Sequence, residues 1–144
     1  MAHEILFETI RIGPVEIKNR LALAPTNTNY SDNHLAGDQT VAFNAARARG
    51  GLGLIIFEAT PVCPEAAETS IYSPHHLWGP EHVPGMLEVT RAIHSYGAKA
   101  FIQLSPGMGV QAAMQNTGVT PRAPSAVNIK LEMDDMAASI IAEV

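Results

Sequence analysis

Three short apolar runs in this chain end in the same way, and this repetition constrains the fold more than any other feature. Each run has the length of a strand and stops at a proline beside small polar residues: RLALAP at 20–25, GLIIFEATP at 53–61 and KAFIQLSP at 99–106. Continuous apolar runs are typical of parallel strands buried on both faces. Because proline lacks the N–H that a central strand donates, each strand should end before its proline. We therefore expect strands at about 21–23, 54–57 and 100–104, with their polar ends at one edge of a sheet.

Helical patterns separate these runs. Apolar and small residues recur at helical spacing in 38–49, where Asp38 is predicted as the N-cap, and in 83–96, and glycines follow both segments. Upstream, residues 10–19 alternate between apolar and polar around a Gly-Pro pair, which predicts a small hairpin. The order is therefore a hairpin followed by about three βα units.

Two fold classes share this order: the open doubly wound α/β sheet and the (β/α)₈ barrel. A whole barrel usually takes about 250 residues, so 144 residues would be its N-terminal part. A third helical pattern begins near Asp134 and is still in register at Val144. We therefore expect residues 1–144 to be one N-terminal segment of a single domain, ending within a helix.

Composition excludes several classes of function. The net charge of −5 and the absence of any Lys/Arg run argue against a nucleic-acid surface. A single cysteine, Cys63, rules out an intramolecular disulfide framework and favours a reducing cytoplasm. No run approaches the ~18 apolar residues of a membrane span. We expect a cytoplasmic protein that binds neither nucleic acid nor membrane.

Most motifs that could carry chemistry are better explained without it. The glycines at 50–53 precede a strand, so they cannot place a pyrophosphate on a helix N-terminus, and no Lys-Ser/Thr follows the glycines at 107–109. The adjacent pair His75-His76 lacks the i, i+4 spacing of a zinc site, so we expect loop histidines without a role and no metal. Cys63 is expected to be an ordinary loop thiol.

Glu58 and Gln103 stand apart, because each ends an apolar strand and would be costly to bury without partners. Each could contact a ligand or belong to a network that ties loops together. The glutamine amide offers one acceptor and two donors, which suits a ring edge with alternating acceptors and donors. Tyr30 and Asn27, on the loop after the first strand, could reach the same ligand or simply pack there.

Three segments in this order resemble the N-terminal part of the Old Yellow Enzyme family, the flavin-dependent ene-reductases that include 2,4-dienoyl-CoA reductases: LFETIRIGPVEIKNRLALAPTNTNY, RARGGLGLIIFEAT and IHSYGAKAFIQLSPG. The resemblance implies a TIM barrel that holds FMN at its C-terminal rim. NAD(P)H would reduce the FMN, and an alkene conjugated to a carbonyl, a small-molecule enone or enoyl compound, would reoxidise it.

The same resemblance assigns cofactor contacts to residues of all three strand ends. Ala24, Pro25 and Thr26 would lie along the flavin, with Asn27 at a position that tunes it. Ala59 would contact the polar edge of the ring, and Gln103 would bond its pyrimidine. Tyr30 lies near a substrate-side tyrosine of some members and is the one catalytic candidate.

Two departures limit what the resemblance carries over. The family pattern QLxHxGR reads QLSPGMGV at 103–110, without its His and Arg. The later strands of the family carry the histidine pair, or His/Asn pair, that holds the substrate carbonyl, together with the proton-donating tyrosine and the phosphate loops. We therefore expect the partner to be a complementary C-terminal chain or a second copy of this one. The alternative is a non-catalytic half-barrel fragment that serves assembly or binding.

Overall fold

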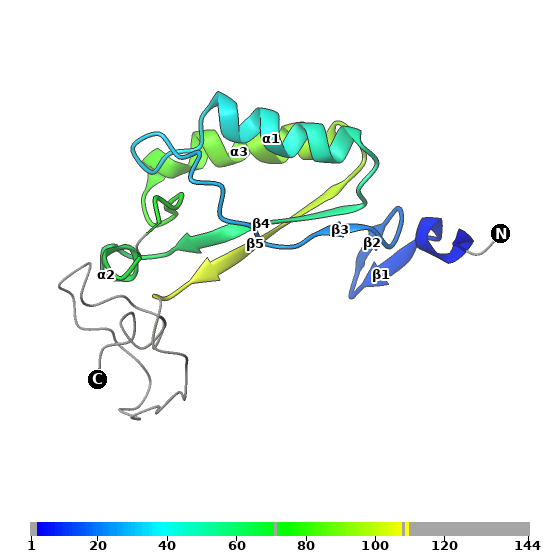
Figure 1. The fold of residues 1–144 in the computed structure, drawn as a ribbon, viewed down its shortest axis with the longest axis horizontal. Coiled ribbons are helices and arrows are strands. Elements are labelled where there is room, and N and C mark those ends of the chain that lie inside the picture. Colours follow the sequence, from blue (N-terminus) through cyan, green and yellow to red (C-terminus); the bar gives the residue numbers. More distant parts are fainter. Residues whose placement is uncertain (1–2, 71, 108, 110–144) are drawn as a thin grey trace, which may run out of the picture.

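The computed structural model describes residues 3–70, 72–107 and 109. A parallel three-stranded sheet forms its centre, with the strands side by side in chain order (Figure 1). The strands are β3 (Ala22–Leu23), β4 (Leu54–Pro61) and β5 (Lys99–Ser105). The three apolar runs therefore do form strands that point the same way. β4 and β5 end at one edge of the sheet, whereas β3 ends at Leu23, opposite Ile55 of β4.

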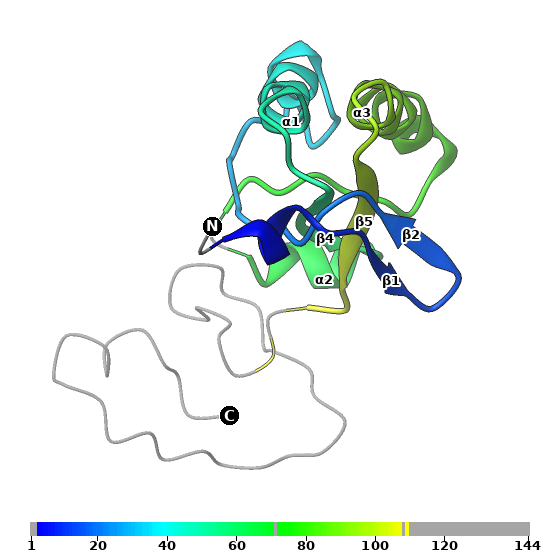
Figure 2. The ribbon, with the colours of Figure 1, turned by 90° about the vertical axis from the view of Figure 1, so that its right-hand side faces the viewer.

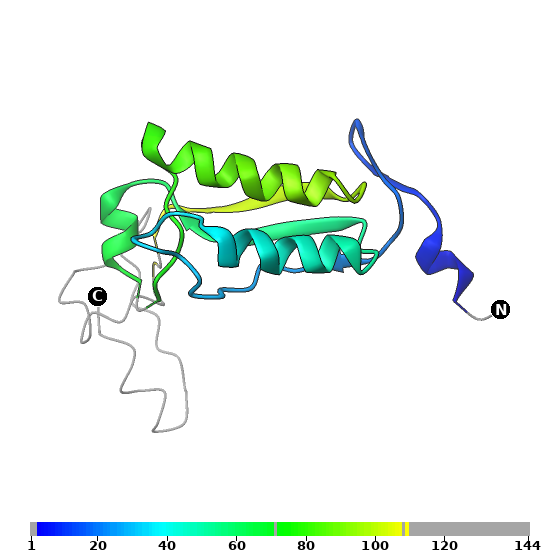
Figure 3. The ribbon, with the colours of Figure 1, turned by 90° about the horizontal axis from the view of Figure 1, so that it is seen from above.

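The two long helices lie on the same face of this sheet. These helices are α1 (Asp38–Arg49) and α3 (Val83–His94), and they run side by side over the strands (Figures 2 and 3). A doubly wound sheet carries helices on both faces, whereas a barrel carries them all outside. The described residues thus have the arrangement of a barrel segment. One half of a doubly wound sheet shares this arrangement, because right-handed connections between consecutive parallel strands place their helices on one face.

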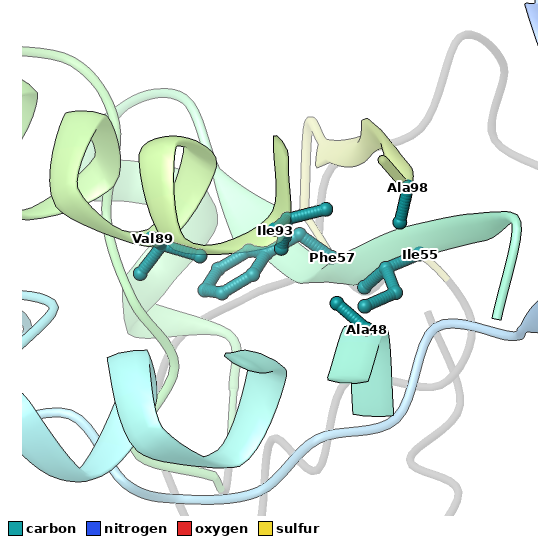
Figure 4. Packing of buried hydrophobic residues seen from close by; sticks show 6 residues of the cluster. All are labelled: Ala48, Ile55, Phe57, Val89, Ile93 and Ala98. Carbon is teal, nitrogen blue, oxygen red and sulfur yellow. The ribbon is translucent and has the colours of Figure 1, made fainter. Parts of the chain in front are cut away.

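The hydrophobic core lies between these helices and the sheet (Figure 4). Ile55 and Phe57 point to the same side of β4 because side chains alternate along a strand. Val89 and Ile93, one helical turn apart on α3, meet them there. Full burial of each such large side chain contributes about 1.5–3 kcal/mol to folding. The cluster is completed by Ala48 of α1 and by Ala98.

The helix boundaries follow the sequence prediction with one correction. Gly37 occupies the N-cap of α1, and Asp38 is the first helical residue, so the prediction of Asp38 as the cap is wrong. Its carboxylate still lies in the first turn, where it interacts favourably with the helix dipole. Gly51, with a φ of +104°, ends α1 in the left-handed conformation that glycine adopts without strain.

The predicted hairpin forms a sheet of its own. Strands β1 (Ile10–Ile12) and β2 (Val15–Ile17) pair antiparallel, and Gly13 takes a φ of +55° in the turn. The hairpin lies beyond the amino ends of the parallel strands, whereas the short helix α2 (Pro64–Glu68) lies beyond their carboxyl ends (Figure 1). The hairpin therefore lies at the end of the sheet opposite the expected site.

Strand β4 is longer than predicted and includes its proline. It continues past Phe57 to Pro61, which pairs with Ser105 of β5. Strand β3 pairs only as far as Ile55 of β4. Beyond that point no described strand lies on the other side of β4, so a proline at its end deprives no neighbour of a hydrogen bond.

The segment between β4 and α3, predicted as a long loop, contains two short helical elements. It contains α2, with Pro64 in the first turn, where a missing N–H costs nothing. A 3₁₀ turn, Pro80–His82, leads directly into α3, and another, Glu4–Phe7, precedes β1. The helix expected from Asp134, and Met108 and Val110 in the loop that departs from the family pattern, lie outside the described residues.

Candidate functional site

A β-bulge lies near the carboxyl ends of β4 and β5. The register of their pairing changes between Phe57 and Thr60, and within this interval Glu58 and Ala59 of β4 lie opposite a single residue of β5, Gln103. A bulge bends its strand and redirects side chains, and bulges are frequent next to active sites. It brings two predicted cofactor contacts, Ala59 and Gln103, to neighbouring positions.

Gln103 lies on the face of the sheet that the helices leave open. Ala100 and Ile102 of β5 pack against the core beneath the helices, so the alternation of side chains turns Gln103 to the opposite face. The residue is exposed, and its amide makes no hydrogen bond to any residue that the structure describes. One acceptor and two donors are therefore free for a ligand at this position.

The predicted cofactor segment, Ala24 to Asn27, connects the end of β3, opposite Ile55, to Thr28, which bonds Glu58 in the bulge. Ala24, Thr26 and Asn27 are exposed, and Pro25 is half-buried. The hydroxyl of Thr26 donates to the carbonyl oxygen of Ala24 at 3.1 Å, which stabilises a local turn. Pairing of β3 with β4 stops at Leu23, so no ladder hydrogen bond to β4 occupies the main chain of this segment.

Glu58 is buried in the bulge and fully bonded. Only 4% of its surface is exposed. One carboxylate oxygen, Oε2, accepts hydrogen bonds from the backbone N–H and the hydroxyl of Thr28, both at 2.8 Å. The other, Oε1, lies 2.6 Å from Nδ1 of His75. The interpretation of Glu58 as part of a network that ties loops together is confirmed.

The surroundings of Glu58 stabilise its ionised form. Burial raises the pKa of a carboxyl group because it removes water from the charge. The hydrogen bonds from His75 and Thr28 and the charge of His75 act in the opposite direction, and they prevail, so the pKa of Glu58 is lowered from its usual value. Glu58 is therefore a carboxylate at neutral pH and acts as a hydrogen-bond acceptor.

His75 has a structural role, contrary to the expectation for this loop. Its side chain is completely buried. It bridges Glu58 and Thr40 of α1, whose hydroxyl lies 2.8 Å from Nε2. The ring also packs edge-to-face against Phe57, with centroids 5.1 Å apart. The prediction that this histidine has no role is wrong, because the fold brings a buried acid and a helix to either side of it.

Tyr30 is anchored by its main chain and packs its ring on α1. Its carbonyl oxygen accepts a hydrogen bond from the hydroxyl of Thr40 at 3.2 Å, and its N–H donates to the hydroxyl of Thr28 at 3.3 Å. The ring meets Phe43 edge-to-face at 5.6 Å. Its hydroxyl makes no hydrogen bond to a described residue.

A stack of aromatic rings borders this network. The ring of His76 lies parallel to that of His34 at 3.9 Å and stacks on Trp78 at 4.1 Å. Nε2 of His76 is buried and has no hydrogen-bond partner among the described residues. Burial, reinforced by the nearby histidines, lowers the pKa of His76 to about 4. His76 is therefore neutral at physiological pH.

Two features are absent from the part of the chain that the structure describes. No three His, Cys, Asp or Glu side chains there are placed to hold a metal ion. No helix in the same part is long and apolar enough to cross a membrane. Cys63, the predicted loop thiol, is free and half-buried at the N-cap of α2.

Sequence reasoning missed three members of the network, Thr28, Thr40 and His75. A glutamate within an apolar strand signals that a buried partner exists. It does not reveal which residue that partner is, because His75 follows Glu58 by 17 positions and Thr40 lies 35 before His75. Only the packing of α1 and of the 72–76 loop around the strand end brings them together.

Comparison with known proteins places the chain among flavin enzymes. Residues 5–141 match the NADH:flavin oxidoreductase / NADH oxidase family. An NADH oxidase of Thermoanaerobacter brockii is 34% identical over 124 residues, 85% of this chain and 19% of that protein. An NADPH dehydrogenase of Halalkalibacterium halodurans is 35% identical over 130 residues, 87% of this chain and 36% of that protein.

Solved structures give the same result. An old yellow enzyme homologue from Zymomonas mobilis shares 31% identity with a TM-score of 0.69, over 85% of this chain and 34% of that one. Morphinone reductase in complex with tetrahydroNAD shares 26% identity with a TM-score of 0.72, over 85% of this chain and 33% of that one. These neighbours are TIM-barrel enzymes, and this chain covers only their N-terminal part.

The length and the cofactor follow from these matches. The chain spans about a fifth to a third of the length of the curated relatives described above. The cofactor of the family is FMN, and NADH or NADPH is its reductant. The exposed strand ends and the unpaired amide of Gln103 fit a polar ring system. This chain belongs to the NADH:flavin oxidoreductase / NADH oxidase family.

Proposed function

We propose that the chain supplies one side of the FMN site of an ene-reductase, an enzyme that reduces the C=C bond of α,β-unsaturated carbonyl compounds with NADH or NADPH. The observation that carries this proposal is the bulge near the carboxyl ends of β4 and β5, which sets Ala59 beside Gln103, and to which the chain after β3 is bonded through Thr28 and Glu58. Membership of the flavin oxidoreductase family supports it.

Each strand end would make a different contact with the cofactor. The main chain of Ala24 to Thr26, which makes no ladder hydrogen bond to β4, would lie along the flavin, and Asn27 would tune it. Ala59, at the bulge, would contact the polar edge of the ring. The amide of Gln103 would donate to and accept from the pyrimidine. The hydroxyl of Tyr30, which has no partner among the described residues, is the proposed contact on the substrate side.

FMN, when bound, supplies hydride transfer from the nicotinamide to the β-carbon of the alkene. The chain's own contribution is to hold and orient, since its described strand ends offer main-chain groups and one amide. Positioning of reactants is worth several kcal/mol of the barrier in well-organised sites. The groups that would hold the substrate carbonyl are proposed to come from a partner.

That partner is proposed to be a complementary C-terminal chain or a second copy of this one. Among the described residues, β3 and β5 are the outer strands of the parallel sheet, and Leu104 of β5 is 56% exposed. Unpaired strand edges and exposed apolar side chains favour association. The free thiol of Cys63 supports a cytoplasmic location.

The test is a visible absorption spectrum of the purified chain, alone and with any polypeptide that co-purifies, together with the intact mass of each component. A flavin absorption band that survives desalting supports the proposal, and mass spectrometry of the released cofactor identifies FMN. A colourless protein that takes up no added FMN, alone or with its partner, contradicts it and leaves a fragment used for assembly or binding.

A matched pair of variants locates the cofactor. Gln103→Leu removes the proposed pyrimidine contact, and we expect it to weaken FMN binding roughly tenfold, the loss of one or two hydrogen bonds. Gln39→Leu makes the same chemical change at an exposed position of α1. Equal FMN affinity in the two variants, measured by fluorescence titration, would remove Gln103 from the site.

A further inference from the structure

One buried acid holds the main chain that directly follows the segment proposed to face the cofactor. Glu58 accepts two hydrogen bonds from Thr28, which directly follows Asn27. Thr28 in turn accepts a hydrogen bond from the N–H of Tyr30 through its hydroxyl oxygen. The carboxylate therefore reaches, through a single threonine, the two loop residues that we propose to contact flavin and substrate.

A second branch of the network reaches the same residue from the other side. Glu58 bonds Nδ1 of His75 at 2.6 Å, and Nε2 of His75 lies 2.8 Å from the hydroxyl of Thr40. That hydroxyl donates to the carbonyl oxygen of Tyr30 at 3.2 Å. The N–H of Tyr30 is thus held through Thr28, and its C=O through Thr40, so this peptide segment cannot rotate freely.

The Glu58–His75–Thr40 part of the network is closed to water, whereas Thr28 and Tyr30 are half-buried. Exposed fractions are 4% for Glu58, 0% for His75 and 2% for Thr40. Water cannot replace a hydrogen bond lost in such surroundings, so removal of one partner leaves a buried polar group unsatisfied. Buried networks of this kind fix one conformation when every member is satisfied.

Glu58 lies within the bulge, next to the proposed cofactor contacts. Glu58 immediately precedes Ala59, and both lie opposite Gln103. A carboxylate bonded at this point therefore constrains the bulge itself as well as the loop after β3. The same residue is linked to two of the three strand ends at the edge of the sheet.

We propose that Glu58 and His75 are positioning residues for the FMN site, which set the main chain of the 27–30 segment and of the bulge at Ala59 without contacting the cofactor. This inference rests on the proposed function. It predicts that weakening the network loosens Thr28 and Tyr30 locally and lowers FMN affinity, while the core under the helices stays intact.

The central experiment combines amide hydrogen exchange with FMN titration of Glu58→Gln, in the chain together with any polypeptide that co-purifies. Glutamine keeps the shape but replaces one acceptor oxygen by an N–H₂ group that cannot accept. We expect the amide of Thr28 to exchange at least about tenfold faster, in line with the loss of a charge-assisted hydrogen bond. We expect FMN to bind roughly tenfold more weakly and its visible spectrum to shift, whereas the amide of Ile55 in the core is unchanged.

Three further variants test whether the effect is specific to this network. Glu88→Gln makes the same change on the exposed face of α3 and should leave both exchange and FMN affinity as in the wild type. Thr28→Val removes the hydroxyl while keeping the N–H bond to Glu58, and Thr28→Ser retains the hydroxyl. Valine should weaken FMN binding and serine should restore it, so the test survives if Glu58→Gln does not fold.

The outcomes separate this inference from the proposed function. If the wild type binds FMN and Glu58→Gln binds it equally well with the same spectrum, although Thr28 exchanges faster, the network is only a structural tie and the inference is overturned. Unchanged exchange at Thr28 overturns it as well. If the wild type itself binds no FMN, the proposed function fails, and the positioning role falls with it.

Discussion

The two halves of β4 have different roles in the molecule. The first half, Leu54 to Phe57, packs Ile55 and Phe57 into the apolar core beneath α1 and α3. The second half, Glu58 to Pro61, carries the bulge and a buried carboxylate that bonds two loops. One continuous strand therefore serves the fold at its start and the candidate site at its end.

This difference reflects two kinds of force. Apolar burial is non-directional, so it holds helices on a sheet but specifies the orientation of a loop poorly. Hydrogen bonds depend on distance and angle, so a carboxylate with three donors can fix a backbone segment. Mutations in the first half should therefore reduce global stability, and those in the second half should change local geometry.

The largest expected effect comes from the first half. Phe57→Ala removes a ring that is 5% exposed and packs in the core. It should lower the free energy of unfolding by about 3–5 kcal/mol, the usual range for a large-to-small change with a cavity. Urea denaturation followed by circular dichroism measures the loss. A loss below about 1 kcal/mol would contradict the assignment of this half to the core.

The next largest effect is the contribution of His76, the stacked histidine beside the network, to the pH dependence of stability. The folded protein keeps His76 neutral down to about pH 4, whereas the unfolded chain protonates it below about pH 6.5. Protons then favour the unfolded state, so His76 should lower stability by about 2 kcal/mol between pH 7 and pH 5. His76→Phe should remove this part of the slope. Parallel stability curves for wild type and variant between those pH values would exclude the effect.

A smaller loss of stability is expected where the first turn of α3 packs against the backbone just before α1. Gly85 lies in the first turn of α3, and a Cβ there would overlap the carbonyl oxygen of Ala36. Alanine normally stabilises a helix relative to glycine, but here we expect Gly85→Ala to destabilise the protein by about 1–2 kcal/mol. Gly37→Ala, at the N-cap of α1 where a Cβ meets nothing within 4 Å, is the control for the loss of a glycine. A more stable Gly85→Ala protein would show that the contact is loose.

The smallest effect should come from an exposed ion pair outside both halves. Glu88 and Arg91 of α3 lie 2.7 Å apart with both side chains more than half exposed. Pairs of this type contribute about 0.3–0.5 kcal/mol on a helix surface. Glu88→Gln should therefore change the denaturation midpoint only slightly. A loss comparable to that of Gly85→Ala would mean that α3 depends on its surface charges.

Much of the fold could be predicted from the chain alone, because periodicity and breakers are local signals. The hairpin around Gly13 and the helix at 38–49 agree with the structure, and the strand starts agree to within one residue. The predicted end of β4 was wrong. Whether a strand can include Pro61 depends on how far the neighbouring strand β3 extends, which the sequence does not show. The predicted cofactor residues lie at or beside the strand ends, but their contacts with FMN stay a prediction.

The sequence by itself determined that parallel strands end in polar residues at one edge, since apolar runs, prolines and glycines act over a few residues. It also indicated that Glu58 needs a buried partner. Only the tertiary structure decided that both helices cover one face and that a bulge sets Glu58 and Ala59 against Gln103. It alone identified His75 as the partner of Glu58. These features depend on contacts between residues far apart in the chain, which no local pattern encodes.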